Sequence, residues 1–425
     1  MKEGTGPMTK LAVIGQGYVG LPLSEAAADN GFEVVGVDAH PGLVDQLNDG
    51  RSHVDDLNDA DIERMLEQGY RATTDYGEVA DADYVVICVP TPLSDDGGPD
   101  LSAVKSATRS VAGVLRAGTT VVLESTTYPG TTEEVVLPIL QESGLEYGQD
   151  FFLAFSPERI NPGFPEFGIR NTPKLVGGVT MECTEKATAM YRRFVDEVVP
   201  LKGAREAETA KLLENTYRHV NIALVNEMAR FCHDMDIDIW EAIRGAATKP
   251  FGFQKFTPGP GVGGHCIPID PNYLSHHVKR TLGYPFRFVE LAQEINEKMP
   301  QYVVQRGADL LNDAEKSVKG SDVLLLGVTY KPNIADQRES PAIPVANGFL
   351  SRGANVSFYD PFVETWRLPS GDLPRVPDLE AAVRAADLVV LLQDHRSFGS
   401  DDLAGSSAAF LDTRGVTDTG RATRL

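Results

Sequence analysis

The chain has no uninterrupted apolar run of the roughly 18–20 residues that a membrane-spanning helix needs, so we expect no membrane segment. It also has no signal-peptide pattern, because glycines and a glutamine interrupt its first apolar run. Basic residues are scarce: 39 Lys and Arg stand against 61 Asp and Glu, a formal net charge of −22. Nucleic acids and anionic lipids need a basic footprint, so neither is an expected partner. We expect a cytoplasmic protein.

Cysteine is scarce as well, with four in 425 residues. No two are close in sequence, which excludes a C-x-x-C redox or zinc pair, and a disulfide framework is not expected without a signal peptide. We interpret Cys88, Cys183 and Cys232 as small buried hydrophobic residues, because they lie in strand-like or helical patterns or carry no motif. Only Cys266 has a setting that favours another role.

Strand-like and helix-like segments alternate from residue 10 to about residue 160, which predicts a parallel sheet with helices on both faces. The alternation returns from residue 319, where the segments "GVTYK", "GANVSFYDP" and "ADLVVLLQ" echo the first part of the chain. Asp360 then stands where Asp38 stands in the first copy, but the second copy lacks a three-glycine turn. We therefore predict an internal repeat of two similar α/β domains.

The middle of the chain reads differently. Residues 206–243 contain no Gly, no Pro and no strand-like segment, which predicts one unusually long helix. Residues 286–311 are also helical in pattern, with Pro300 as a kink or break. The fold class is therefore α/β, with two Rossmann-like doubly wound domains joined by a central helical domain that contains a long helix. We place the domains at 1–200, 201–302 and 303–425.

Gly15, Gly17 and Gly20 form a G-x-G-x-x-G turn between a predicted strand and a predicted helix, and Asp38 ends the next strand. Such glycines permit a tight turn and let the backbone approach a pyrophosphate, while the helix N-terminus supplies N–H donors. Asp38 would accept hydrogen bonds from ribose hydroxyls and repel a 2′-phosphate, which favours NAD over NADP. A plain glycine turn is the alternative. The motifs "CVPTP" and "ESTTYPGTTEE" follow later strands at the same sheet edge, where Thr126 is either a turn hydroxyl or a polar group beside the nicotinamide.

Residues 257–271 read "TPGPGVGGHCIPIDP", with four glycines and four prolines around Cys266. The glycines permit unusual backbone angles and the prolines restrict the unfolded loop, so we interpret Cys266 as a nucleophile on a stiff loop. Asp270 lies close to it in sequence. Lys211 and Asn215 share one face of the predicted long helix, either as a solvated pair or beside the thiol, where a lysine would favour the thiolate.

NAD and a cysteine nucleophile together suggest a four-electron oxidation of an alcohol to an acid through a thiohemiacetal and a thioester. A metal is not expected, because His265, His276 and His277 do not have zinc-ligand spacing.

These motifs, together with "SPERINPG", "AKLLENTYRHVNIALVNE" and "GVTYKPNIADQRESP", resemble the UDP-glucose/GDP-mannose dehydrogenase family over essentially the whole chain. The resemblance implies oxidation of the 6-hydroxymethyl group of a UDP-sugar to a carboxylate with two NAD⁺. It implies an NAD-binding domain at 1–200, a dimerisation domain at 201–302 that carries the cysteine loop, and a UDP-sugar domain at 303–425. A homodimer through the central helix is expected, and larger assemblies are left open.

The resemblance also implies roles for single residues. Cys266 is the nucleophile, Lys211 and Asn215 stabilise the oxyanion, and Asp270 assists the hydrolytic water. Thr126 and Glu158 order that water and act in acid–base steps. The implied cofactor contacts are Gly15, Gln16, Gly17, Tyr18, Val19, Gly20, Asp38, Pro90, Thr91, Thr126 and Arg338. The implied substrate contacts are Glu158, Arg159, Lys211, Asn215, Arg218, Gly261 and Lys331.

The identity of the substrate's sugar is inferred only from the resemblance of sequence motifs. "GGHCIPIDP" and "SPERINPG" resemble the branch that acts on 2-acetamido sugars, and Ile269 and Pro162 stand where the UDP-glucose branch has a lysine and a second glutamate. We therefore expect UDP-N-acetylglucosamine first, UDP-N-acetylmannosamine next, and UDP-glucose or another sugar last. Two alternatives from other classes are a two-electron dehydrogenase with Cys266 as a bystander and a catalytically silent NAD-binding scaffold.

Overall fold

A computed structural model describes residues 8–54, 56–94, 98–160, 168–264, 267, 269–418, 420 and 422–425, without the side chain of His277. Within these residues we find no helix with both the length and the apolar character that crossing a membrane requires. The chain forms two compact units, residues 1–214 and 215–425, and each is described by itself.

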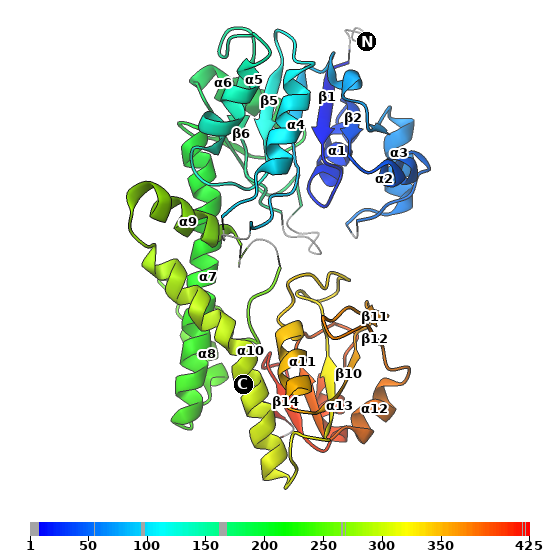
Figure 1. The fold of residues 1–425 in the computed structure, drawn as a ribbon, viewed down its shortest axis with the longest axis vertical. Helices are drawn as coiled ribbons and strands as arrows, with labels where there is room; N and C mark the ends of the chain where they lie inside the picture. The colour runs from blue at the N-terminus through cyan, green and yellow to red at the C-terminus, as the bar shows by residue number, and fades with distance from the viewer. Residues whose placement is uncertain are drawn as a thin grey trace. The chain divides into compact units, whose positions relative to one another are not determined.

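An eight-stranded sheet forms the centre of the first unit, in the order β3-β2-β1-β4-β5-β6-β7-β8 (Figure 1). Its strands are β1 (Lys10–Ile14), β2 (Glu33–Val37), β3 (Arg71–Thr73), β4 (Tyr84–Ile87), β5 (Thr120–Leu123), β6 (Phe152–Phe155), β7 (Lys174–Gly178) and β8 (Val198–Pro200). The prediction of a parallel sheet is correct except at one pair, because β7 runs antiparallel to β6. A parallel return needs a crossover, usually a helix, and the described residues between these two strands include none.

Alternate residues of each strand point to opposite faces of the sheet, so the first unit has two apolar cores. Leu11 and Val13 pack with α1 (Gly20–Asp29) and α6 (Met181–Tyr191) on one face. Ala12 and Ile14 pack with helices on the other. The remaining helices of the unit are α2 (Pro41–Asn48), α3 (Asp59–Glu67), η1 (Tyr76–Val79), α4 (Ser102–Ala112), η2 (Thr132–Val136) and α5 (Leu137–Gln141).

The second unit contains a five-stranded parallel sheet in the order β10-β9-β13-β14-β15. One core lies between this sheet and α10 and α11, and the other lies on the face covered by α12 and α13. The strands are β9 (Asp322–Leu326), β10 (Asn355–Tyr359), β13 (Leu388–Leu391), β14 (Phe410–Asp412) and β15 (Thr423–Arg424), with a hairpin of β11 (Thr365–Trp366) and β12 (Leu373–Pro374). The helices are α8 (Ile239–Ala246), α9 (Asp270–Leu282), α10 (Arg287–Asp313), α11 (Ala342–Ser351), α12 (Leu379–Ala385) and α13 (Ser400–Ser406).

The predicted single helix over 206–243 is wrong at its C-terminal end. Helix α7 spans Ala204–Asp234, and α8 begins separately at Ile239. Asp236 takes a left-handed backbone conformation (φ 54°), which ends α7, and Asp238 accepts the N–H groups of Trp240 and Glu241 as the cap of α8. The run "DMDID" therefore contains a stop and a start although it has no Gly or Pro. Pro300, in contrast, lies inside α10 and does not end it.

The predicted internal repeat is confirmed by matching hydrogen bonds in the two sheets. At the end of β1 the amide of Gln16 donates to Asp38 Oδ2 (2.9 Å), and at the end of β9 the amide of Val328 donates to Asp360 Oδ2 (2.8 Å). Each of these amides belongs to the second residue after its strand, and each aspartate directly follows the neighbouring strand. The two copies therefore share their geometry at the carboxyl edge of the sheet, where open α/β sheets bind ligands.

A glycine precedes that amide in both copies. The amide of Gly15 donates to Val37 (2.7 Å) and that of Gly327 donates to Tyr359 (2.9 Å), and both glycines have positive φ. A Cβ at Gly327 would lie 2.2 Å from the carbonyl oxygen of Gln393. The turn after the first strand thus needs glycine in both units, for conformation and for space.

We predict that Gly327→Ala destabilises the protein at least twice as much as Gly320→Ala. Both glycines have positive φ, but nothing lies within 4 Å of a Cβ at Gly320. The Gly320 change therefore costs only the strain of a left-handed alanine, about 1–2 kcal/mol, while the Gly327 change adds a backbone collision. Urea unfolding of both variants measures the difference. Equal losses would show that the close approach to Gln393 does not constrain the fold.

Candidate active site

The three glycines of the first turn differ in what surrounds them. A Cβ at Gly15 would lie 2.8 Å from the oxygen of Cys88, and a Cβ at Gly20 would lie 1.8 Å from the oxygen of Gly15. A Cβ at Gly17 would meet nothing within 4 Å. Gly15 and Gly20 are therefore required by packing, while Gly17 leaves open space beside the backbone, as a pyrophosphate site needs.

Helix α1 begins at Gly20 with no side-chain cap and no acidic residue in its first turn. The N-terminus of a helix carries a partial positive charge, so this end is suited to an anion. Asp38 is half-buried at the end of β2, where it accepts the amides of Gln16 (2.9 Å) and His40 (3.0 Å). These two bonds fix the carboxylate beside the glycine turn.

The side chain of Gln16 is committed to the core. Its Nε2 donates to the carbonyl of Val13 (2.9 Å), and its Oε1 accepts from Ser24 (3.2 Å) and Tyr70 (2.9 Å). The side chain is fully buried. Of the predicted cofactor contacts, Gln16 therefore has only backbone atoms to offer, whereas Tyr18 and Val19 are half-exposed.

The ends of β4 and β5 are joined by side-chain hydroxyls. Thr91 donates to the carbonyl of Thr126 (2.8 Å), and Ser125 donates to the carbonyl of Val89 (2.6 Å). Thr91 and Thr126 are half-buried, and Pro90 is exposed. The structure thus brings two predicted cofactor contacts, Thr91 and Thr126, together at the same sheet edge as the glycine turn.

Glu158 and Lys211 meet in the first unit. Glu158 follows β6, and its carboxylate accepts the amide of Ile160. The ammonium of Lys211 on α7 donates to the backbone carbonyl of Glu158, and Lys211 is 7% exposed. Lys211 is therefore buried at this loop and is not a solvated surface lysine.

Arg159 is held on two sides. Its guanidinium forms an ion pair with Glu214 of α7 (2.7 Å) and donates to the carbonyl of Pro173 (2.5 Å). These bonds tie the loop after β6 both to α7 and to the segment that enters β7. Arg159 thereby fixes the position of Glu158, its neighbour.

Glu208 lies on the same face of α7 as Lys211, and its role was not predicted from the sequence. Its carboxylate accepts the amides of Gly130 (2.6 Å) and Thr132 (2.9 Å) and the hydroxyl of Thr132 (2.7 Å), and it is fully buried. The sequence could have grouped Glu208 with Lys211, because residues three positions apart are neighbours on the surface of a helix. Glu208 anchors the loop that carries Thr126 to the helix that carries Lys211.

A buried ion pair lies beneath this sheet edge. Lys174 Nζ is 2.9 Å from Glu124 Oε1, which also accepts the hydroxyl of Tyr191. Burial lowers the pKa of Lys174, but the nearby charges of Glu124 and Glu158 outweigh it and the net pKa is raised. The lysine is therefore charged at neutral pH. The pair supports the strand ends from which Thr126 and Glu158 project.

Asn215 and Asp270 meet in the second unit. Asn215 Nδ2 donates to Asp270 Oδ2 (2.5 Å), and both residues are at most 5% exposed. Asp270 is the first residue of α9, so this bond joins α7 to the end of the glycine- and proline-rich loop. Cys266, four residues before Asp270, lies outside the described residues, as do His265 and Pro162.

The glycines of that loop pack against the C-terminal part of the chain. A Cβ at Gly263 would lie 2.6 Å from the oxygen of Glu339, and a Cβ at Gly264 would lie 2.6 Å from the ring of Tyr330. Asn226 of α7, which is fully buried, accepts the amide of Gly259 (3.0 Å). The loop is therefore positioned by the close approach of its glycines to Glu339 and Tyr330 and by the buried side-chain amide of Asn226, which was not predicted from the sequence.

The predicted basic contacts have different settings. Arg338 is paired to both oxygens of Asp336 (2.9 and 2.7 Å), and its side chain is 57% exposed. Lys331 follows Tyr330, so it lies beside the residue that contacts Gly264. Arg218 is exposed on α7. Lys331 and Arg338 thus flank the cysteine loop, whereas Arg218 lies on an open helix face.

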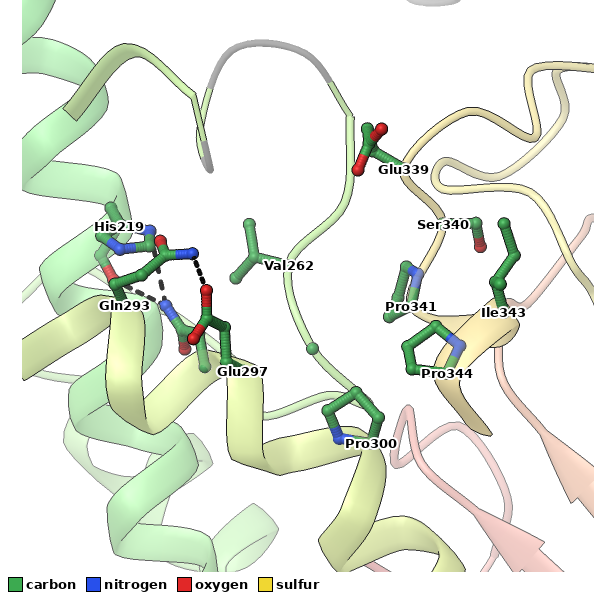
Figure 2. A pocket seen from close by; sticks show the side chains of 12 residues that line it. His219, Val262, Gln293, Glu297, Pro300, Glu339, Ser340, Pro341, Ile343 and Pro344 are labelled. Carbon is green, nitrogen blue, oxygen red and sulfur yellow. Dashed lines mark hydrogen bonds between the residues drawn. The ribbon is translucent and has the colours of Figure 1, made fainter. Parts of the chain in front are cut away.

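A cavity of about 390 Å³ lies beside Gly261 in the second unit (Figure 2). His219 lines it at 1% exposure, and its Nε2 has no hydrogen-bond partner among the described residues. Burial lowers the pKa of His219 to about 4, so the ring is neutral at pH 7. The other lining residues are Gly261, Val262, Gln293, Asn296, Glu297, Pro300, Glu339, Ser340, Pro341, Ile343 and Pro344. The two carboxylates of this set disfavour an anionic occupant.

The fold and the glycine turn are those of a protein that binds a dinucleotide cofactor. Models of the UDP-glucose/GDP-mannose dehydrogenase family match three successive parts of the chain: the NAD binding domain at residues 9–195, the central domain at 205–298 and the UDP binding domain at 324–419. The chain belongs to the UDP-glucose/GDP-mannose dehydrogenase family. It is an oxidoreductase of the nucleotide-sugar dehydrogenase class, and its cofactor is NAD.

Relatives match over nearly the whole chain. The UDP-N-acetyl-D-mannosamine dehydrogenase of Pyrococcus horikoshii is 36% identical over 92% of this chain and 90% of its own length. The NDP-N-acetyl-D-galactosaminuronic acid dehydrogenase of Ralstonia nicotianae is 36% identical over 96% of each chain. Among solved structures, the UDP-D-ManNAc dehydrogenase of P. horikoshii has a TM-score of 0.89 at 33% identity, covering 98% of this chain and 99% of that chain.

We predict that His219 makes the protein less stable as the pH falls from 6.5 to 4. The unfolded imidazole titrates near 6.5 and the folded one near 4, so between these values the unfolded chain binds more protons. The contribution is present above pH 6.5, is lost as the pH falls toward 4, and amounts to at most about 3 kcal/mol.

His219→Asn removes the titration and keeps an acceptor near Asn296. Urea unfolding at pH 7.0, 5.5 and 4.5 should show the free energies of the two proteins converging in acid. Parallel curves would contradict a buried neutral histidine.

Proposed function

We propose that this enzyme oxidises the 6-hydroxymethyl group of a UDP-linked 2-acetamido sugar to the carboxylate in two steps, with Cys266 as the covalent nucleophile. NAD, when bound, accepts a hydride at each step. The thiolate of Cys266 adds to the aldehyde produced by the first oxidation, and the second oxidation leaves a thioester that water hydrolyses. One alcohol, one water and two NAD⁺ thereby give one acid, two NADH and the protons released.

The observation that carries this proposal is the buried Asn215–Asp270 hydrogen bond at the end of the cysteine loop. A binding module has no need for a buried amide and carboxylate at that position. We assign Lys211 and Asn215, which share a face of α7, to the oxyanion of the covalent intermediates. Asp270 assists the hydrolytic water, and Thr126 and Glu158 order that water and act in the acid–base steps.

For the cofactor we assign the glycine turn to the pyrophosphate and Asp38 to the ribose hydroxyls. The open space beside Gly17 and the acid-free first turn of α1 support the first assignment. The position of Asp38 beside Gln16 supports the second. Arg338 and Lys331 are assigned to the anionic nucleotides, because they are among the few cations of an acidic chain that lie next to the cysteine loop.

The sugar is the finer part of the proposal. The sequence reading placed UDP-N-acetylglucosamine ahead of UDP-N-acetylmannosamine. The names of the relatives favour the second: similar proteins from P. horikoshii and Salmonella typhi are named UDP-N-acetyl-D-mannosamine dehydrogenases. We therefore propose a 2-acetamido sugar, with the mannosamine epimer first and the glucosamine epimer next. UDP-glucose is less favoured, because Ile269 replaces the lysine of that branch.

We also propose the three-domain division at 1–200, 201–302 and 303–425, supported by the order of the three family models. The compact units divide the chain once, after Glu214, inside α7. The central domain is thus proposed from sequence similarity, and its boundaries stay predictions, as does the cytoplasmic location.

We predict two NADH per sugar consumed, with one of three UDP-sugars far ahead. The purified enzyme is given UDP-N-acetylmannosamine, UDP-N-acetylglucosamine and UDP-glucose in parallel, and NADH and acid are both quantified. A ratio of two supports the thioester route, and the preferred sugar settles the epimer. A ratio of one would mean that the product is the aldehyde and that Cys266 is a bystander.

The same assay separates the thiol from the rest of the site. Cys266→Ser should keep NAD and UDP affinity but lower acid release by at least about 100-fold, because a serine hydroxyl stays protonated at neutral pH and is a far poorer nucleophile than a thiolate. Cys232→Ala, another thiol of the same unit, is the matched control and should turn over normally. Normal turnover by Cys266→Ser would remove the cysteine from the mechanism.

We further propose a homodimer through α7. Four apolar side chains of this helix are 40–54% exposed and follow one face at spacings of 7, 4 and 3: Tyr217, Leu224, Met228 and Phe231. A contiguous apolar stripe at this spacing is typical of a helix that packs against another chain. It continues the expectation of a homodimer that the sequence raised.

Leu224→Glu combined with Phe231→Glu should therefore convert a dimer into a monomer in analytical ultracentrifugation. Asn312→Glu, a charge at an exposed position of α10, is the control and should leave the mass unchanged. The prediction is wrong if the double variant sediments like the wild type, or if the wild type is itself monomeric.

A further inference from the structure

The second α/β unit contains a buried copy of the Asp38 position. Asp360 accepts the amides of Val328 (2.8 Å) and Phe362 (2.9 Å), just as Asp38 accepts those of Gln16 and His40. Asp38 is half-buried and so remains accessible, but Asp360 is completely buried. Something other than a nucleotide therefore fills the space in front of Asp360.

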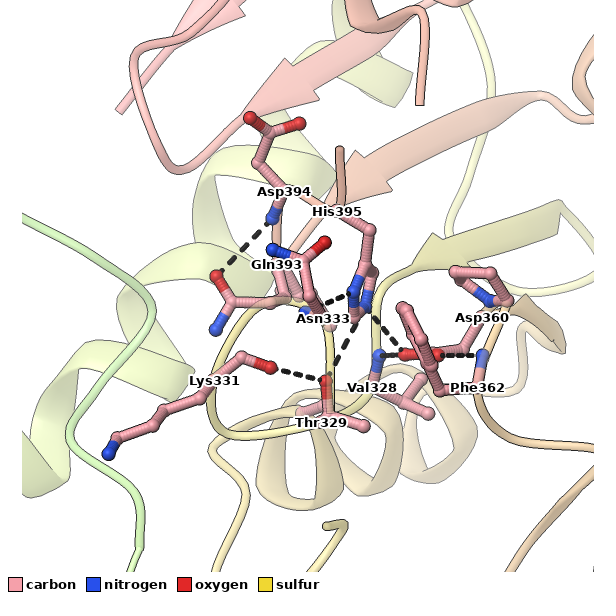
Figure 3. A network of polar contacts seen from close by, with 12 residues as sticks. Val328, Thr329, Lys331, Asn333, Asp360, Phe362, Gln393, Asp394 and His395 are labelled. Atoms are coloured by element: carbon pink, nitrogen blue, oxygen red, sulfur yellow. Dashed lines mark hydrogen bonds and ion pairs between the residues drawn. The ribbon is translucent and has the colours of Figure 1, made fainter. Parts of the chain in front are cut away.

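That space is filled by His395, which is also completely buried (Figure 3). His395 Nε2 lies 2.9 Å from Asp360 Oδ2, and His395 Nδ1 accepts the amide of Asn333 (2.9 Å). Because Nδ1 accepts, the ring proton resides on Nε2 and is donated to the aspartate. The rings of Phe362 and Phe398 lie 5.2 and 5.3 Å from the imidazole. The imidazole thus makes with Asp360 the kind of contact that a ribose hydroxyl is proposed to make with Asp38.

The two ring nitrogens of His395 act on the two ends of one loop. Asp360, held by Nε2, fixes the amide of Val328, where the loop leaves β9. Nδ1 fixes the amide of Asn333, which has a positive φ of 62°. Between these ends lies Lys331, the cation assigned above to the nucleotide.

The carbonyls between the two ends are held as well. Thr329 donates to the carbonyl of Lys331 (2.8 Å), and Gln393 donates to the carbonyl of Tyr330 (3.0 Å). The side chain of Lys331 extends away from this cluster (Figure 3). In the loop of residues 328–333, two amides and two carbonyls are thus held by hydrogen bonds from within the second unit. These bonds also fix the direction in which the side chain of Lys331 leaves the backbone.

We propose that His395 is a positioning residue for Lys331: it occupies the ribose-type position of the second unit and clamps the loop that presents this lysine to the UDP moiety. The inference rests on the proposed function, since the UDP contact of Lys331 is itself proposed. It goes beyond that function by giving the buried His395, through its hydrogen bond to the amide of Asn333, a role in substrate affinity. The second unit cannot hold a dinucleotide ribose at Asp360 while His395 is there.

Two isosteric variants separate the two ends of the clamp. His395→Asn keeps an acceptor near the amide of Asn333, and His395→Gln keeps a donor near Asp360. We expect UDP, measured by isothermal titration with the full-length protein, to bind about 10-fold more weakly to the Gln variant and within about 2-fold of wild type to the Asn variant. NAD affinity should be unchanged in both, because the glycine turn and Asp38, which are assigned to its pyrophosphate and ribose, lie in the first unit.

A double-mutant cycle tests whether His395 acts through Lys331. Lys331→Met should weaken UDP binding, and adding His395→Gln should weaken it no further. An additive double variant would overturn the inference, and so would a Gln variant that binds UDP like the wild type while Lys331→Met does not. If Lys331→Met leaves UDP affinity unchanged, the lysine assignment fails and the inference fails with it, while two NADH per sugar would still uphold the proposed reaction.

Discussion

The bond from a backbone amide to an aspartate at the end of the neighbouring strand organises both α/β units. In each unit the chain leaves the first strand through a glycine with positive φ, and the next amide donates to the aspartate that follows the second strand. A carboxylate that accepts two amides is fixed in direction and is stabilised by charge-assisted hydrogen bonds. The glycine turn of the first unit and the loop of Lys331 in the second unit both depend on this bond for their position.

The acidic composition of the chain restricts which of its groups can bind anionic ligands. With 61 acidic residues against 39 basic ones, many cations already have carboxylate partners, as Arg159 and Arg338 show. The glycine turn avoids the problem, because it offers backbone amides and a helix end with no acidic residue. Lys211 avoids it in another way, since it is buried against the backbone carbonyl of Glu158 and forms no ion pair with a carboxylate in the part of the chain that the structure describes.

Much of the fold could be predicted from the sequence because strands and turns leave local patterns. The G-x-G-x-x-G turn, the ends of the strands and the repeat of Asp38 by Asp360 are all visible as spacing. The break at Asp236 was not, since a non-glycine residue in the left-handed region carries no reliable local signal. The reversed pairing of β7 also depends on contacts distant in sequence.

The site was predictable only in part for the same reason. Lys211 and Asn215 could be grouped by helical spacing, but their partners could not, because Glu158 and Asp270 lie 53 and 55 residues away. Glu208, Asn226 and His395 were missed because a single polar residue in an apolar pattern does not disclose whether it is buried. Their importance comes from backbone amides that only the folded chain brings to them.

The occupation of the Asp360 carboxylate by His395 has a consequence for inhibitor design. The two α/β units share a fold and the same aspartate geometry, so an adenosine mimic aimed at the ribose contact would be expected to meet two similar targets. In the second unit a phenylalanine-flanked imidazole already occupies that position. A compound that competes for the Asp38 contact therefore has one such contact per chain to saturate, and its dose–response should follow a single-site curve with respect to NAD.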